Sequence, residues 1–207
     1  MTPAVLPHHP RSRALVRATF VAWIVCCLVA GAYMLGAHLL TLPKPDAGDL
    51  QRSAVMGRLP SQRGRWLAVH VLDQDCKCSQ RVLDHLLAGP RPLAVAERVV
   101  LIASAVAPER IAAITAAGFD LDIVTPDQLF ARYHLEAAPL LVVADPANTV
   151  RYIGGYGPRK QAADLRDVAM IEALERGERV APLPTFGCAV SRGLRTAVDP
   201  LGIRSWK

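Results

Sequence analysis

The chain has 207 residues, enough for one ordinary domain with additional segments, and a formal net charge of +6. Its charges are interspersed and aromatic residues make up only 5% of the sequence, which argues against a basic surface that binds nucleic acid. The mean hydropathy of +0.24 is high for a soluble protein, and the apolar excess is concentrated near the N-terminus.

Residues 18–42 contain no Lys, Arg, Asp or Glu and are long enough to cross a bilayer. A cleaved signal peptide is the alternative, but its apolar core would be shorter and followed by a small-residue cleavage site. The length of this segment and the lack of a clear cleavage site favour an uncleaved transmembrane anchor.

The charges around the apolar segment predict its orientation. Arg11, Arg13 and Arg17 precede it, whereas the basic residues that follow it are diluted by acidic ones. The positive-inside rule therefore predicts a cytoplasmic tail at residues 1–17 and an exported C-terminal part. Because the Ala- and Arg-rich composition suggests a bacterium, we expect a single-pass inner-membrane protein whose C-terminal domain faces the periplasm.

Residues 43–64 are interrupted by Pro and Gly and predict a tether. A globular domain is expected at 65–176, followed by a tail at 177–207 with little periodicity. Ser79 is the expected cap of the first helix, and a Thr-Pro-Asp-Gln sequence from Thr125 predicts the start of a later one. The elements expected in chain order are strand 66–72, helix 79–88, strand 98–103, helix 108–117, short strand 119–124, helix 126–133, strand 140–144, strand 149–153 and helix 161–176.

The alternation of early strands and helices predicts a parallel sheet, and the short link at 145–148 predicts an antiparallel hairpin at its end. The sequence Cys76-Lys77-Cys78 follows the first strand and opens the first helix. The positive end of a helix stabilises a thiolate, the form of cysteine that reacts with disulfides. This position predicts a thiol–disulfide redox site at the carboxyl end of the first strand.

A disulfide between residues i and i+2 closes a very small ring, so its geometry requires local strain, and strain makes the bond easier to reduce. The spacing of Cys76 and Cys78 therefore favours an oxidising or isomerising site over a structural disulfide. Lys77 and the helix end lower the thiol pKa while Asp73 and Asp75 oppose them, which leaves the sign of the net shift open.

The strand at 66–72, the cysteine pair that opens a helix and the block at 125–155 resemble the thioredoxin-like superfamily, especially its membrane-anchored, exported members. The resemblance covers about residues 65–176. It implies an α/β fold, a three-layer α/β/α sandwich with a mixed sheet, here preceded by one transmembrane helix. It also implies a thiol–disulfide oxidoreductase that acts on exported protein thiols or disulfides and uses no cofactor.

The family places a cis-proline beside its disulfide, which implies that Ala138-Pro139 shapes the substrate groove. It also implies that Cys76 attacks the partner and Cys78 resolves the mixed disulfide. The departure from the family is the motif, because the usual spacing is C-x-x-C and Asp75 stands where a Trp is usual. Either Cys76 and Cys78 form the pair, or Cys76 and Ser79 occupy the usual positions and Cys78 is additional.

Two other classes of function remain open. Two thiolates and an imidazole suit copper(I), so the chain could be a copper-binding assembly factor that uses His70, His85 or His134. The sequence has no His-x-His or repeated C-x-x-C framework, so no metal site is predicted. A non-catalytic, anchored interaction module is the third alternative.

The remaining cysteines have separate interpretations. Cys26 and Cys27 lie in the anchor and are interpreted as small apolar residues. Cys188 is a candidate auxiliary thiol in a loop of the tail. Because three exported cysteines are an odd number, the sequence leaves open whether Cys76 pairs with Cys78 or with Cys188.

Overall fold

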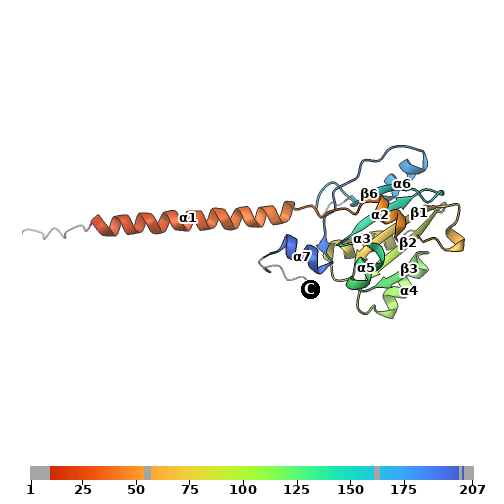
Figure 1. The fold of residues 1–207 in the computed structure, drawn as a ribbon, viewed down its shortest axis with the longest axis horizontal. Helices are drawn as coiled ribbons and strands as arrows, with labels where there is room; N and C mark the ends of the chain where they lie inside the picture. The colour runs from red at the N-terminus through yellow and green to blue at the C-terminus, as the bar shows by residue number, and fades with distance from the viewer. Residues whose placement is uncertain (1–9, 54–56, 161–163, 201, 203–207) are drawn as a thin grey trace, which may run out of the picture. The chain divides into compact units, whose positions relative to one another are not determined.

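The computed structural model describes residues 10–53, 57–160, 164–200 and 202. The chain divides into two units, one that ends at Leu40 and one that starts at Thr41 (Figure 1). Each unit is described by itself.

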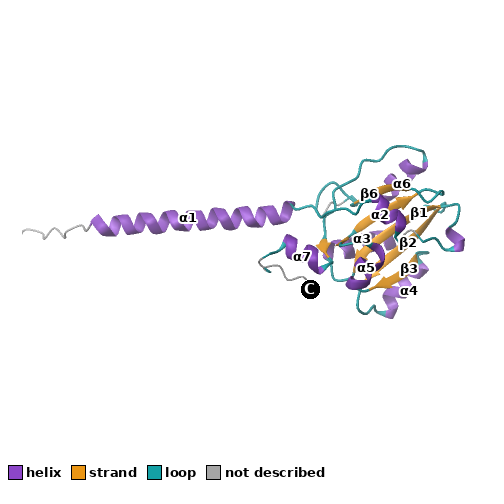
Figure 2. Cartoon of the chain, viewed as in Figure 1, coloured by secondary structure: helices purple, strands orange, loops and turns teal. Residues whose placement is uncertain are grey.

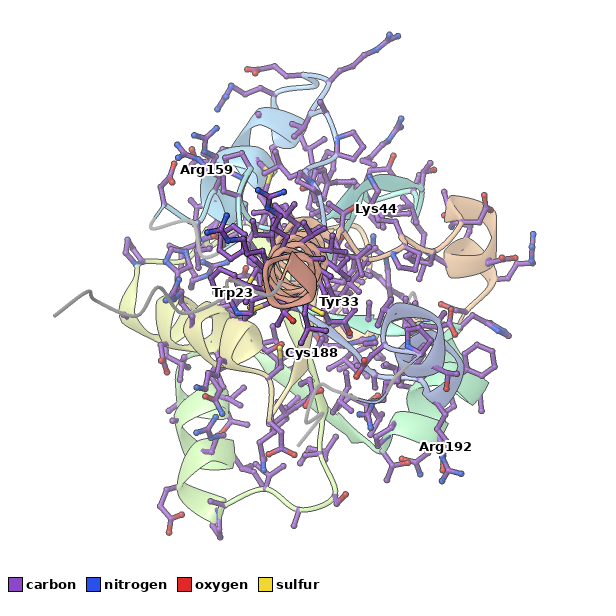
Figure 3. All side chains as sticks on the ribbon, turned by 90° about the vertical axis from the view of Figure 1, so that its left-hand side faces the viewer. Trp23, Tyr33, Lys44, Arg159, Cys188 and Arg192 are labelled. Atoms are coloured by element: carbon purple, nitrogen blue, oxygen red, sulfur yellow. The ribbon has the colours of Figure 1, made fainter. Side chains whose placement is uncertain are left out.

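The first unit is the long helix α1 (Pro10–Leu39). Its apolar part, Arg13–Gly36, is long and apolar enough to cross a membrane, and none of it is buried within the structure. Trp23 and Tyr33 project outward from this helix (Figure 3). The helix begins before the predicted span because Ala14-Leu15-Val16-Arg17 also favours helix; residues 1–9 of the predicted tail lie outside the described residues.

The second unit is built on a five-stranded mixed sheet with the order β3-β2-β1-β5-β6 (Figure 2). Neighbours β1 and β2 are parallel, as are β2 and β3, whereas β5 is antiparallel to both β1 and β6. The predicted parallel pairing of the early strands and the predicted antiparallel hairpin at the end of the sheet are both confirmed. The strands are β1 (Trp66–Asp73), β2 (Val95–Ile102), β3 (Asp120–Val124), β5 (Leu140–Ala144) and β6 (Val150–Gly154).

Helices cover both faces of the sheet, which gives the predicted three layers. One core cluster packs α3 (Lys77–Ala88), α4 (Pro108–Ala116) and α6 (Asp167–Glu175) against the sheet. The other packs α2 (Ala47–Arg52) and α5 (Pro126–Tyr133) against the opposite face. Because β1 and β5 are covered on both sides, they read as continuous apolar runs rather than as alternating patterns.

The predicted cap of α5 is present. Thr125 Oγ1 accepts a hydrogen bond from the Gln128 amide at 3.3 Å, and Gln128 Oε1 accepts one from the Thr125 amide at 2.9 Å. We expect Thr125→Ala to lower the free energy of unfolding by about 1 kcal/mol because it removes one of these bonds. Denaturant titration measures the loss. In the control Thr115→Ala, the lost hydroxyl bonds only carbonyls of its own helix, so an equal loss there would contradict the assignment.

Two helix starts differ from the predictions. Helix α3 begins at Lys77 with Cys76 as its cap, so Ser79 is not the cap but a buried residue of the first turn, 1% exposed. The turn after β1 causes this, because the Cys76 amide already bonds the Asp73 carbonyl at 3.1 Å. Helix α6 begins at Asp167 rather than at residue 161; residues 161–163 lie outside the described residues.

The segment predicted to be a tether packs on the domain where it is described. It forms α2 and the short 3-10 helix η2 (Pro60–Gln62), and Leu50 is fully buried in the core. Arg58 donates hydrogen bonds to the Gln62 carbonyl at 3.0 Å and to Asn148 Oδ1 at 2.9 Å. One buried leucine and one well-placed arginine attach a segment whose local composition resembles a linker.

The tail also forms structure. Its strand β7 (Cys188–Ala189) pairs antiparallel with the short strand β4 (Ala137–Ala138). Helix α7 (Arg192–Val198) follows, and Ser191 Oγ accepts a hydrogen bond from the Leu194 amide at 3.1 Å. These elements are too short for a periodic signal and are held by contacts with distant residues.

Candidate redox site

The site lies where β1 ends and α3 begins. The chain leaves the sheet at Asp73, turns, and enters the helix with Cys76 at the cap and Cys78 in the first turn. The amide N–H groups of Cys78 and Ser79 face the Cys76 sulfur. The predicted placement of a thiol at a helix N-terminus is present in the structure.

The peptide bond between Ala138 and Pro139 is cis, and it lies beside the thiols. Cys76 Sγ is 3.9 Å from the carbonyl oxygen of Ala138. The structure therefore brings together the four residues that the sequence analysis singled out as attacking thiol, second thiol and substrate groove.

Cys188 joins the same site from the tail. It is the register partner of Ala138 in the β4–β7 pair, and it lines the same cavity as Cys76. The sequence identified Cys188 as a candidate auxiliary thiol and left open whether Cys76 pairs with Cys78 or with Cys188; the structure places both beside Cys76.

The three thiols differ in exposure. Cys76 is 2% exposed, whereas Cys78 and Cys188 are partly buried. A cavity of about 230 Å³ is lined by Cys76 and Cys188 together with Asp73, Asp75 and Arg195. A second cavity of about 130 Å³ is lined by Cys78, and its basic residues are Lys77, Arg81 and Arg159. Cys76 is thus covered, while the other two thiols face two different cavities.

The pKa values of the three thiols shift in different directions. Bonds from the Cys188 and Cys78 side chains and from the Ser79 and Cys78 amides lower the pKa of Cys76 and outweigh its burial. The same bonds, together with burial, raise the pKa of Cys78 and the pKa of Cys188. The lowered pKa favours the thiolate form of Cys76, which is the form that acts as a nucleophile.

Asp73 opposes the negative charge on the thiols, as the sequence suggested. Asp73 Oδ1 accepts a hydrogen bond from the Asp75 amide at 3.0 Å, which orders the turn. Burial raises the pKa of Asp73, and the Cys76 charge raises it further. Arg195 of α7 lines the same cavity and donates to the Ala189 carbonyl at 3.0 Å. Asp73 therefore orders the turn and opposes the charge on Cys76, whereas Arg195 connects the site to the tail.

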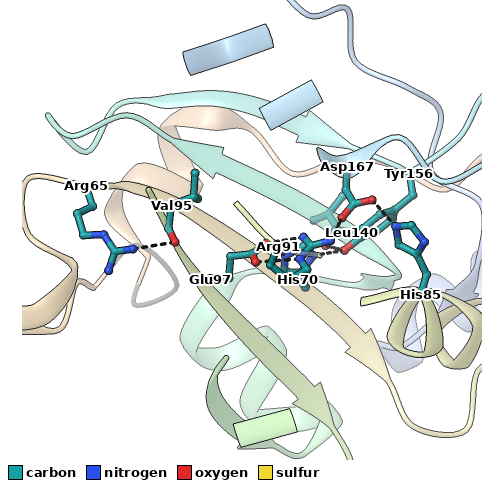
Figure 4. A network of polar contacts seen from close by, with 9 residues as sticks. All are labelled: Arg65, His70, His85, Arg91, Val95, Glu97, Leu140, Tyr156 and Asp167. Atoms are coloured by element: carbon teal, nitrogen blue, oxygen red, sulfur yellow. Dashed lines mark hydrogen bonds and ion pairs between the residues drawn. The ribbon is translucent and has the colours of Figure 1, made fainter. Parts of the chain in front are cut away.

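The candidate histidine ligands have other partners. His70 Nδ1 lies 3.0 Å from the Tyr156 hydroxyl and His70 Nε2 lies 3.2 Å from Glu97 (Figure 4). His85 Nε2 lies 2.8 Å from Asp167, and His134 is an exposed residue at the end of α5. Within the described part of the chain, no group of three or more His, Cys, Asp or Glu side chains is placed to hold a metal.

His70 and His85 belong to a buried polar network that the sequence did not predict (Figure 4). Arg91 joins the two carboxylates of this network: its Nη1 is 2.7 Å from Asp167 and its Nε is 2.9 Å from Glu97. Burial opposes the charge on Glu97, but hydrogen bonds from Arg91 and His70 outweigh it and lower the pKa of Glu97 to about 2. The network is structural, since its members pair with one another beneath α3 and α6.

The sheet order, the helix that carries the cysteines after the first strand, and the cis-proline before the central antiparallel strand define a thioredoxin-like domain. No protein-family model matches the chain, and a search of curated proteins finds no match.

Solved structures with a similar fold include proteins of three bacteria. An uncharacterized conserved protein from Geobacillus kaustophilus has 17% identity and a TM-score of 0.49, with 63% of this chain and 78% of that chain covered. A hypothetical protein from Sinorhizobium meliloti has the same identity and TM-score, with 74% and 91% covered. A secreted disulfide oxidoreductase from Mycobacterium tuberculosis has 15% identity and a TM-score of 0.42, with 63% and 99% covered.

Proposed function

We propose that the protein is a membrane-anchored thiol–disulfide oxidoreductase that acts on exported protein partners by exchange at Cys76 and Cys78. The observation that carries the proposal is the position of Cys76. Its sulfur lies at a helix N-terminus, where the first-turn amides and the neighbouring thiols lower its pKa, and it is 3.9 Å from the Ala138 carbonyl oxygen. A stabilised thiolate beside an extended backbone segment is suited to exchange with a disulfide held in a peptide.

The proposed reaction has two steps. The Cys76 thiolate attacks a partner disulfide, a new S–S bond forms, and the partner's second sulfur leaves as a thiolate that takes a proton. Cys78 then loses its proton and attacks Cys76, which releases the partner as a dithiol and leaves a Cys76–Cys78 disulfide. The partner gains two electrons and the protein loses two; the reverse sequence oxidises a partner.

Ala138 and Pro139 are the proposed partner-binding residues. The backbone of Ala138 pairs with an extended strand, and Pro139, which has no N–H, forms the adjoining wall of the cavity beside Cys78. A partner strand that took the place of β7 on this edge would be recognised by its backbone rather than its side chains, which suits an enzyme that acts on several protein sequences.

The proposed location follows from α1. Residues 1–17 would be cytoplasmic, 18–42 would span a bacterial inner membrane, and residues from 43 onward would face the periplasm. The apolar span Arg13–Gly36 supports an anchored protein. The periplasm is a compartment in which disulfides form and persist, so redox-active thiols have substrates there.

Cysteine alkylation of the purified full chain tests the proposal. We expect two more cysteines to react after reduction than after oxidation with oxidised glutathione, and we expect Cys76→Ser to abolish this difference. The matched control is Cys26→Ser/Cys27→Ser, which removes two thiols of the anchor and should keep the difference. Equal alkylation of the oxidised and reduced wild-type protein would contradict the proposal. It would favour the alternative of a non-catalytic, anchored interaction module.

A Cys78→Ser/Cys188→Ser variant identifies the partners. Without a second thiol beside it, Cys76 should stay bound to partner sulfur, so mixed disulfides should accumulate and disappear on reduction. If the wild-type protein instead bound one copper(I) through Cys76 and showed no exchange, the copper-binding alternative would replace the proposed function.

A further inference from the structure

The tail runs as an extended segment across the face of the site. The Gly155 amide donates to the Leu183 carbonyl at 3.1 Å, and the Val190 amide donates to the Glu136 carbonyl at 2.6 Å. Between these points, β7 pairs with β4. The backbone edge at Ala137–Ala138 is therefore already occupied by a strand of the same chain.

Glycines allow this close approach. A Cβ atom on Gly187 would lie 2.0 Å from the Ala138 carbonyl oxygen, and one on Gly155 would lie 2.1 Å from the Pro184 carbonyl oxygen. Both contacts are with backbone atoms, which cannot move aside as a flexible side chain can. The tail and the loop before Pro139 fit together only because these positions have no side chain.

The docked tail places Cys188 against the reactive sulfur. Cys188 is opposite Ala138 in register, and Cys76 Sγ is 3.9 Å from the same Ala138 carbonyl oxygen. Cys76 is 2% exposed, and Cys188 of the docked tail lines the same cavity, so the tail restricts the access of a protein disulfide to the Cys76 sulfur. The side chain of Cys188 on the tail is labelled in Figure 3.

We propose that residues 183–190 are an internal substrate strand, and that Cys188 forms an intramolecular disulfide with Cys76 in the position of a partner's sulfur. This inference rests on the proposed function and specifies which sulfur Cys76 engages when no partner is bound. The tail competes with partners for the Ala138 edge, so it protects the thiolate until a partner displaces it.

The chemistry balances with a disulfide of a partner protein as the oxidant. Cys76 attacks that disulfide and releases one partner thiol. Cys188 then loses a proton and attacks Cys76, which forms the Cys76–Cys188 bond and releases the second partner thiol; two electrons pass to the partner. Attack of Cys78 on Cys76 would then give a Cys76–Cys78 disulfide and return Cys188 to a thiol, with no net transfer of electrons.

The linkage can be read directly from the full chain. The reduced protein is oxidised with oxidised glutathione, the remaining thiols are blocked, and the protein is digested with trypsin. Lys77 separates Cys76 from Cys78, and Cys188 is on a third tryptic peptide, so each disulfide gives a different product. We expect the Cys76 peptide joined to the Cys188 peptide, and a larger share of this product in Cys78→Ser, which lacks the competing thiol.

A pair of glycine variants tests the docked strand itself. Gly187→Ala should prevent docking, cause loss of the Cys76–Cys188 product and speed the alkylation of Cys76 in the reduced protein. The control Gly193→Ala lies in the same tail, has nothing within 4 Å of the added Cβ, and should behave as wild type. Equal behaviour of the two variants would overturn the internal strand.

The outcomes separate this inference from the proposed function. A Cys76–Cys78 disulfide in the wild type, together with a Cys76–glutathione adduct and free Cys188 in Cys78→Ser, would overturn the internal substrate and keep the exchange chemistry. Recovery of Cys76 as a free thiol in the wild type and in Cys78→Ser would overturn the internal substrate strand and the proposed exchange chemistry together.

Discussion

Replacement of Arg91 by Ala is expected to lower the free energy of unfolding of the thioredoxin-like domain by about 3–5 kcal/mol. Arg91 is the cation shared by Glu97 and Asp167, and both of these carboxylates are buried. Its removal leaves two negative charges in the interior with only His70 and His85 as partners. Denaturant unfolding of the full chain in detergent, followed by circular dichroism, measures the loss.

The control is Arg151→Ala. Arg151 pairs with Asp145 at 2.7 Å, but its side chain is 54% exposed. Exposed ion pairs contribute little, so the expected loss is below about 1 kcal/mol. Similar losses in both variants would show that burial of the Arg91 network does not matter.

The pH dependence of stability gives an independent readout of the same network. The folded-state pKa of Glu97 is lowered from 4.5 to about 2, so its stabilising contribution is complete above 4.5 and is lost as the pH falls toward 2. In Arg91→Ala the main cause of the lowered pKa is absent, so this contribution should be small at every pH. A variant that kept the acid-dependent loss of the wild type would contradict the pairing.

The parts of the fold that local sequence determines were predictable. Strand β5 was predicted at its observed bounds, because a short apolar run between Pro139 and the turn at Asp145 has no other buried conformation. The start of α5 was predictable because its capping residues are adjacent in the chain. The thiol pair at the strand-to-helix corner followed from the same local order.

The rest depends on contacts between residues that are far apart in the chain. Nothing near Leu50 indicates that it enters the core, and the sequence left open whether Cys188 meets Cys76, because both positions are set by tertiary packing. The buried network was missed for the same reason: His70 and Glu97 are 27 residues apart, and each looks like a surface residue when read alone. The one local signal in the tail was Gly187 next to a cysteine, typical of a close backbone approach.

Replacement of Cys188 by Ala is expected to raise the pKa of the Cys76 thiol. The interaction with the Cys188 side chain is the largest of the causes that lower this pKa. A hydrogen bond to a charged group contributes about 1.5–3 kcal/mol, so its loss should move the thiolate titration upward by about one to two pH units. The ultraviolet absorbance of the thiolate in the reduced full chain measures the shift, with Cys76→Ser to identify the signal.

Cys188→Ser is the matched control, because its hydroxyl keeps a donor at the same place. It should titrate near the wild type, and equal shifts in the Ala and Ser variants would mean that the tail acts by excluding water rather than by donating a hydrogen bond. The lowered pKa of the Cys76 thiol also affects the stability of the reduced protein. It stabilises the fold fully only above the unfolded-state pKa of 9.0, and this contribution declines as the pH falls. The wild type and Cys188→Ala should therefore lose stability with the same slope while both folded-state thiols stay ionised, and the loss should end at a higher pH in Cys188→Ala, which links the docked tail to the charge on the sulfur it covers.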